Sequence, residues 1–173
     1  MGFVILPKYF LFCLHINRSF MLPLHIVLVQ PEIPHNTGAI GRVCVGMDCF
    51  LHLIRPLGFH LDAHHLKRAG MDYWQHVRLA IHDTWDAFLA EVHPPHLFFL
   101  STRGERSLYT CSFQANDALV FGNESSGFPA PFYAHYREAL FKIPMPGTHA
   151  RSINLANAVS ISAYEAYRQL ALA

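Results

Sequence analysis

Short apolar runs alternate with helical segments along most of the chain, and this alternation limits the possible folds more than any other feature. The first run, Leu24–Val29, is rich in β-branched residues and is followed by two prolines and a helical pattern that extends to about Met47. Asn36 or Thr37 is placed to cap that helix. Strands that alternate with helices predict an α/β fold with a mainly parallel sheet flanked by helices.

The same patterns place the later elements. Further strands are expected at Phe50–Ile54, Val77–Ile81, Leu97–Ser101, Ala118–Phe121 and Leu140–Pro144, and further helices at Asp62–Ala69, Asp83–Val92, Pro129–Tyr136 and Asn154–Leu170. Ligands of such sheets bind beyond the carboxyl ends of the strands. The loops expected at those ends are Gln30–Thr37, Thr102–Arg106, Gly122–Gly127 and Met145–Asn154. A functional site is therefore expected where these four loops meet.

Composition restricts the class of protein. Of the 173 residues, 52% are hydrophobic and 14% are charged, and the formal net charge is +1. These values exclude a disordered chain and a polybasic protein that holds nucleic acid by bulk charge. The apolar excess suits a subunit interface or a cofactor pocket. The four cysteines form no C-x-x-C pair, which favours a reducing, cytosolic setting.

The first twenty residues differ from the rest, because thirteen of them are hydrophobic. A signal peptide would need a basic segment before the apolar run and a small-residue cleavage site after it, and the sequence has neither. The stretch is also too short to span a membrane. We expect residues 1–20 to be an extension outside the fold, with Met21 as the natural start and residues 21–173 as a single domain.

The thirteen histidines suggest a metal site, which the sequence supports poorly. His60 and His64 have the helical spacing of a metal-binding pair, and His65 follows them. Neighbouring residues do not complete a ligand set, since Asp62 points elsewhere at helical spacing. Surface histidines are the favoured interpretation, and no metal is expected.

The segment Pro31–Arg42 reads P-E-I-P-H-N-T-G-A-I-G-R, with Asn36 and Arg42 on roughly neighbouring faces of the expected helix. This arginine can clamp a phosphate near a helix start, or it can be a solvated residue of an ordinary capped helix.

In a second segment, Leu119–Gly127, a strand runs directly into Gly122. That glycine can let a ligand approach the backbone, or the segment can be a simple polar turn. It matches neither a P-loop nor G-x-G-x-x-G.

A third segment, Ile143–Ser162, leads into the last helix, which Ser152 or Asn154 can cap. This helix carries small residues that permit the close approach of another backbone, namely Ala156, Ala158, Ser160 and Ala163. It can pack on its own sheet or form a helix-mediated dimer.

Taken in order, these motifs resemble those of the SPOUT methyltransferases, and more narrowly the bacterial tRNA wobble-position ribose methyltransferases. The resemblance rests on P-E-I-P-x-N-T-G-x-I-x-R, on G-F-x-x-D…L-x-R-A-G-x-D-Y in Gly58–Tyr73, and on R-S-x-N-L-x-N-A-V-S in Arg151–Ser160. It extends from Leu24 to about Leu170. It implies a C-terminal trefoil knot, a cytoplasmic homodimer with its active site at the subunit interface, and no association with membranes.

The resemblance also implies transfer of a methyl group from S-adenosylmethionine to the ribose 2′-OH of tRNA nucleotide 34, a cytidine or uridine. The residues that match the family's cofactor-binding positions are Leu100, Gly122, Ile143 and Ser152. Those that match its catalytic positions are Asn36, Arg42, Glu124 and Asn154. Arg42 and Arg151 are expected to bind the tRNA. A guanidinium stays protonated in proteins, so we expect Arg42 to bind a phosphate and stabilise the developing alkoxide.

Three alternatives stay open at this point. The chain can methylate another tRNA or rRNA site, it can be a knotted RNA-binding module without catalysis, or it can be a metal hydrolase, for which the sequence lacks a complete ligand set. The aromatic residue on which an RNA base would stack is also open among Tyr73, Trp74 and Tyr109.

Overall fold

The computed structural model describes residues 24–60 and 72–171. The expectations for residues 1–20, for the helix at 62–69 and for the histidines at 64 and 65 lie outside these residues. None of the helices described is long and apolar enough to span a membrane.

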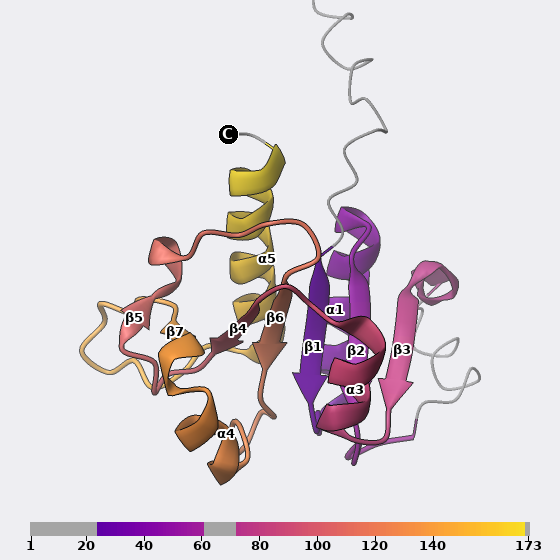
Figure 1. The fold of residues 1–173 in the computed structure, drawn as a ribbon, viewed down its shortest axis with the longest axis horizontal. Coiled ribbons are helices and arrows are strands. Elements are labelled where there is room, and N and C mark those ends of the chain that lie inside the picture. The colour runs from indigo at the N-terminus through magenta and orange to yellow at the C-terminus, as the bar shows by residue number, and fades with distance from the viewer. Residues whose placement is uncertain (1–23, 61–71, 172–173) are drawn as a thin grey trace, which may run out of the picture.

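The described residues form a seven-stranded sheet in which every pairing is parallel. Its strands are β1 (His25–Val29), β2 (Phe50–Ile54), β3 (Arg78–His82), β4 (Leu97–Leu100), β5 (Arg106–Ser107), β6 (Ala118–Phe121) and β7 (Leu140–Lys142). They lie in the order β3-β2-β1-β6-β4-β7-β5, and the arrows of β1, β3 and β6 point the same way in Figure 1. The expected α/β class and parallel sheet are confirmed. The two residues of β5 are too few to give a pattern in the sequence.

Helices cover both faces of the sheet. They are α1 (Pro34–Met47), α3 (Trp85–Val92), α4 (Ala130–His135) and α5 (Leu155–Ala171). Three short 3₁₀ segments lie in the connections between elements: η2 (Asp72–His76), η3 (Leu108–Thr110) and η4 (Arg137–Ala139). One hydrophobic cluster includes residues of α1 and α5, and a second includes residues of α3 and α4. The trefoil knot implied by the resemblance stays a prediction.

The start of α1 differs from the expectation. The helix begins at Pro34, after an extended Ile33 that makes no side-chain cap, so Asn36 and Thr37 lie within the first turn instead of capping it. Proline suits this position because its fixed φ is helical and its missing N–H would have no partner there. Asn36 and Thr37 are both buried, and the Asn36 side chain is thereby available for contacts with another part of the chain.

The expected cap of the last helix is confirmed for Asn154. Its Oδ1 accepts hydrogen bonds from the backbone N–H groups of Ala156, at 2.9 Å, and Asn157, at 3.3 Å. These are orphan donors of the first turn of α5, and a side-chain cap of this kind stabilises a helix by about 1 kcal/mol. Asn154 is therefore fixed at the entrance to α5.

Candidate active site

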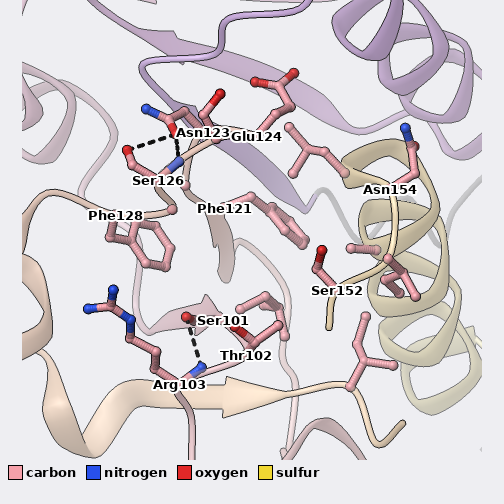
Figure 2. Close-up of a pocket in the computed structure, with 18 of the residues that line it drawn as sticks. Ser101, Thr102, Arg103, Phe121, Asn123, Glu124, Ser126, Phe128, Ser152 and Asn154 are labelled. Atoms are coloured by element: carbon pink, nitrogen blue, oxygen red, sulfur yellow. Dashed lines mark hydrogen bonds between the residues drawn. The ribbon is translucent and has the colours of Figure 1, made fainter. Parts of the chain in front are cut away.

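A cavity of about 530 Å³ lies where the loops after β4, β6 and β7 meet the starts of α1 and α5. All four loops that the sequence analysis selected contribute to its wall. Figure 2 shows Glu124 on the loop after β6, Asn154 and Ser152 beside α5, and Phe121 between them. The cavity has the size of a typical small-molecule site and lies at the sheet edge where such sites form.

The sequence-predicted residues converge on this cavity with one exception. Those that line it are Asn36, Leu100, Gly122, Glu124, Ile143, Arg151, Ser152 and Asn154. Its wall is therefore mixed, with apolar side chains from the strand ends and polar groups from α1, the β6 loop and the entrance to α5.

Glu124 joins the loop after β6 to the start of α1. Its carboxylate accepts hydrogen bonds from the backbone N–H groups of Glu32, at 2.9 Å, and Ile33, at 3.2 Å. In the other direction, the Ser125 hydroxyl donates to the Glu32 carboxylate. An acceptor carboxylate at a helix start also interacts favourably with the helix dipole. Glu124 thus fixes the two residues that lead into α1, whose first turn has no side-chain cap of its own.

Asn36 extends this contact to α5. Its Nδ2 donates to Glu124 Oε1 at 2.9 Å, and its Oδ1 accepts from Asn154 Nδ2 at 2.9 Å. The order of donors is determined, because an ionised carboxylate only accepts and each amide then has its oxygen free for the next donor. The chain ends where Asn154 Oδ1 accepts from the backbone of α5. One hydrogen-bond chain therefore connects all three motif segments.

Gly122 has a different role from the one considered in the sequence analysis. A Cβ built on it would lie 2.3 Å from the carbonyl carbon of Gly127 and 2.5 Å from the nitrogen of Phe128. Its missing side chain accommodates the returning loop, which Asn123 and Gly127 close with reciprocal backbone hydrogen bonds of 3.0 and 3.2 Å. The glycine is required by the fold of the loop, whether or not a ligand also approaches it.

Arg42 is the exception. It is exposed and lines a separate groove between α1 and α5 with Tyr73 and Tyr164. Its guanidinium lies 4.5 Å from the centre of the Tyr73 ring, and the Tyr73 hydroxyl donates to the Gly38 carbonyl at 2.9 Å. Within one subunit, the structure does not bring Arg42 to the cavity that contains Asn36.

Known proteins are similar to this chain in sequence and fold. The model of the SpoU rRNA methylase family matches residues 23–164. A relative from Saccharophagus degradans, named tRNA (cytidine(34)-2'-O)-methyltransferase, is 45% identical over 150 residues, which cover 86% of this chain and 97% of the relative. The chain belongs to the SpoU methylase family.

Two solved structures resemble this SpoU methylase. One, described as giving insights into the 2-OH methylation of C/U34 on tRNA, is 51% identical with a TM-score of 0.80 and covers 87% of this chain and 98% of its own. The other is an AdoMet-bound rRNA methyltransferase from Sinorhizobium meliloti, 24% identical with a TM-score of 0.71, over 86% of this chain and 57% of its own. The second likeness concerns the fold alone.

The aromatic candidates for base stacking differ in their surroundings. A Cβ on Gly41 would lie 2.5 Å from the Trp74 ring, so this ring fills the space above the glycine and packs against the core. Tyr73 is half-buried under Arg42. Tyr109 is 57% exposed and is the most accessible of the three in this SpoU methylase.

One cavity residue of this SpoU methylase could not be predicted from the sequence. Tyr133, from α4, lines the cavity, and the Arg103 guanidinium lies 4.4 Å from the centre of its ring. Arg103 lies in the Thr102–Arg106 loop that the sequence selects, and it was expected among the basic residues near the site, whereas no motif marked Tyr133. The aromatic residues after Pro129 gave the only signal, and they resemble any amphipathic helix.

The described part of this SpoU methylase has buried cysteines and no cluster of potential metal ligands. Those residues contain no group of three or more His, Cys, Asp or Glu arranged to hold a metal ion. Burial raises the pKa of Cys49 to about 11 and that of Cys111 to about 12, so both thiols are protonated near neutral pH. A buried, protonated thiol is not a nucleophile.

Proposed function

We propose that this protein transfers a methyl group from S-adenosylmethionine to the ribose 2′-OH of nucleotide 34, a cytidine or uridine, in tRNA. The observation that carries the proposal is that the three motif segments meet at one cavity, where the Glu124–Asn36–Asn154 hydrogen-bond chain joins them. The names of relatives that are 40–46% identical support nucleotide 34 as the target. We infer a cytoplasmic location from the proposed tRNA substrate, and we propose that residues 21–173 fold as a single domain.

The cavity fits the proposed cofactor. Its volume of about 530 Å³ is within the usual range for small-molecule sites. Leu100 and Ile143 would supply apolar contacts for an adenosine group, and the backbone near Gly122 and Ser152 would supply polar groups beside them. When bound, S-adenosylmethionine supplies an electrophilic methyl group on a sulfonium.

The protein's own part is then positioning and charge stabilisation. Both Glu124 oxygens accept hydrogen bonds from α1 or from the residues before it, which makes Glu124 a positioning residue and a poor candidate for the general base. Asn36 and Asn154 fix the polar wall on which the ribose would lie. Alignment of a weak nucleophile with its target removes a large part of the barrier in such reactions. Arg151 would contact the tRNA from the exposed loop before α5.

To reach the cavity, Arg42 would have to come from a second copy of the chain. We infer a homodimer in which Arg42 of one copy faces the cavity of the other, where it binds the phosphate beside the target ribose and stabilises the developing alkoxide. Supporting this, α5 exposes large apolar side chains close to the Arg42 groove, among them Tyr164 at 56% and Tyr167 at 41%. Exposed apolar patches of this kind mark protein interfaces.

Subunit mixing tests the dimer. Neither Arg42→Ala nor Asn36→Ala should be active alone, but a mixed dimer regains one complete site. Equal mixing after dissociation should restore roughly a quarter of wild-type activity, since half of the dimers are mixed and each has one of two sites intact. Two copies of the same variant, treated identically, are the control. No recovery, with mixed dimers shown by mass spectrometry, would refute the shared site.

Mass spectrometry of tRNA tests the reaction. After incubation with isotopically labelled S-adenosylmethionine, nuclease digestion should give a labelled 2′-O-methyl nucleotide from position 34. The matched substrate carries a 2′-deoxyribose at that position and should gain no label there. A label on a base, or on a ribose elsewhere in the tRNA, would overturn the proposal.

A further inference from the structure

A second depression, of about 270 Å³, shares Arg103 and Tyr133 with the wall of the main cavity. Its other charged residues are Glu105, Arg106, Arg137 and Glu138. Three arginines from the β4–β5 loop, β5 and η4 therefore surround one hollow beside the proposed methyl-transfer site. We propose that this depression binds a phosphodiester group of the tRNA strand next to the target nucleotide. The assignment of tRNA as its ligand rests on the proposed function.

Arg103 is held in place by neutral groups. Its guanidinium stacks 4.4 Å from the Tyr133 ring centre, and the Tyr133 hydroxyl accepts a hydrogen bond of 3.2 Å from the backbone of Phe128. A Cβ on Gly127, whose φ is +74°, would lie 2.7 Å from that hydroxyl, so glycine is required for the ring to sit there. No carboxylate in the described part of the chain pairs with Arg103.

Arg106 is arranged in the same way. Its guanidinium lies 4.5 Å from the Phe141 ring centre, and Nη1 donates to the Glu138 carbonyl at 3.0 Å. Like Arg103, it forms no ion pair with a carboxylate of the described residues. A guanidinium has five N–H donors, and most of those on Arg103 and Arg106 stay available for a ligand.

The acidic residues of the depression leave these two arginines free. Glu105 lies 3.9 Å from Arg137, and both side chains are largely exposed, so this ion pair is weak. Glu138 contacts Arg106 through its backbone carbonyl. Arginines held by aromatic rings, with their donors free, match the planar, bidentate recognition of phosphate. Phosphate contacts orient a nucleic acid without reading its sequence, which suits a site next to the reacting ribose.

RNA binding across a salt range tests the proposal. The full-length protein and its variants are titrated with unmodified tRNA transcript in about 50 to 200 mM salt. Arg106→Gln and Arg103→Gln/Arg106→Gln are compared with Arg78→Gln, which removes one exposed arginine from the start of β3. The double variant should bind roughly tenfold more weakly at low salt, because hydrogen bonds to charged groups are lost. Each lost phosphate contact should also reduce the salt slope by about one.

The variants separate this inference from the proposed reaction. Arg106 does not line the main cavity, so Arg106→Gln should bind S-adenosylmethionine with wild-type affinity in calorimetry, which also shows that it is folded. If both variants bind tRNA with the affinity and salt slope of Arg78→Gln, the phosphate site is wrong even when position 34 is methylated. The other outcome is that the salt slopes of the variants fall as expected but the wild-type protein adds no methyl group at position 34. In that case the proposed reaction is wrong and the phosphate site stands.

Discussion

Three buried histidines form a hydrogen-bonded row across the sheet, and they make the stability of the protein sensitive to pH. His25 Nδ1 lies 2.9 Å from His52 Nε2, and His52 Nδ1 lies 3.0 Å from His82 Nε2. His82 Nδ1 ends the row 3.1 Å from Glu91 Oε2. None of the three histidines is more than 9% exposed. Phe88 packs edge-on against His52 and His82.

The row has one consistent arrangement of protons while its imidazoles are neutral. An ionised Glu91 carboxylate only accepts, so His82 Nδ1 must donate and His82 Nε2 must accept. His52 then donates from Nδ1 and accepts at Nε2, and His25 donates from Nδ1. An additional proton on His52 puts two donors face to face in a buried site. The hydrogen bonds of the row therefore favour the neutral form of His52.

The size of the effect follows from His52. Burial, and then the nearby His25 and His82, lower the pKa of His52 from 6.5 to about 3, and burial also lowers the pKa of His25. At a pH between the unfolded pKa of 6.5 and the folded pKa of about 3, His52 binds the extra proton in the unfolded chain but not in the folded one. The stability of the fold therefore decreases as the pH falls below 6.5. At pH 5 the loss from His52 is about 2 kcal/mol, from 1.36 kcal/mol per pH unit.

Urea unfolding of His52→Gln at pH 7.5 and pH 5, followed by tryptophan fluorescence, tests this reasoning. The variant should be less stable than wild type at pH 7.5 but should lose about 2 kcal/mol less on acidification. His60→Gln, at an exposed position, is the control and should follow wild type. If wild type and His52→Gln lose stability in parallel, the row does not govern the pH response.

Further expectations concern the site. Gly122→Ala should destabilise the fold by about 1–3 kcal/mol in thermal unfolding and weaken S-adenosylmethionine binding, because its Cβ would overlap the backbone of Gly127; wild-type stability would contradict this close approach of the loop. Glu124→Gln should cost about 1–3 kcal/mol and lower kcat while activity keeps its wild-type pH profile, whereas a shifted profile would indicate a proton-transfer role. Arg42→Lys should lose most of its activity with unchanged thermal stability, and full activity would rule out bidentate phosphate binding.

Most of the fold could be predicted from the sequence because its signals are local. The run Leu24–Val29 and the uninterrupted pattern Asn154–Leu170 each fall within a residue of the observed β1 and α5 boundaries. The predicted start of α1 was wrong, because the helix begins at Pro34 without a side-chain cap. The backbone N–H groups just before it, of Glu32 and Ile33, donate instead to Glu124, about ninety positions away in the chain.

For the site, the loops could be predicted from the sequence but the contacts between them could not. The sequence selected the loops that line the cavity, since parallel strands bring their carboxyl ends to one edge. It did not reveal what the polar residues contact there. Asn36 was considered a helix cap and a catalytic group, yet its amide joins Glu124 to Asn154, which lie on two other segments. Tyr133 escaped notice because its role depends on its contact with Arg103.

A net charge of only +1 is compatible with an RNA substrate if some arginines form ion pairs with carboxylates and others do not. Arg55, Arg78 and Arg168 each form an ion pair with a carboxylate at 3.1 Å or less, so their charge is largely neutralised locally. Arg103 and Arg106 instead lie against aromatic rings, which hold a guanidinium without cancelling its charge. Free positive charge is thereby concentrated beside the cavity. Association with a polyanion depends on such local potential more than on the total charge of the chain.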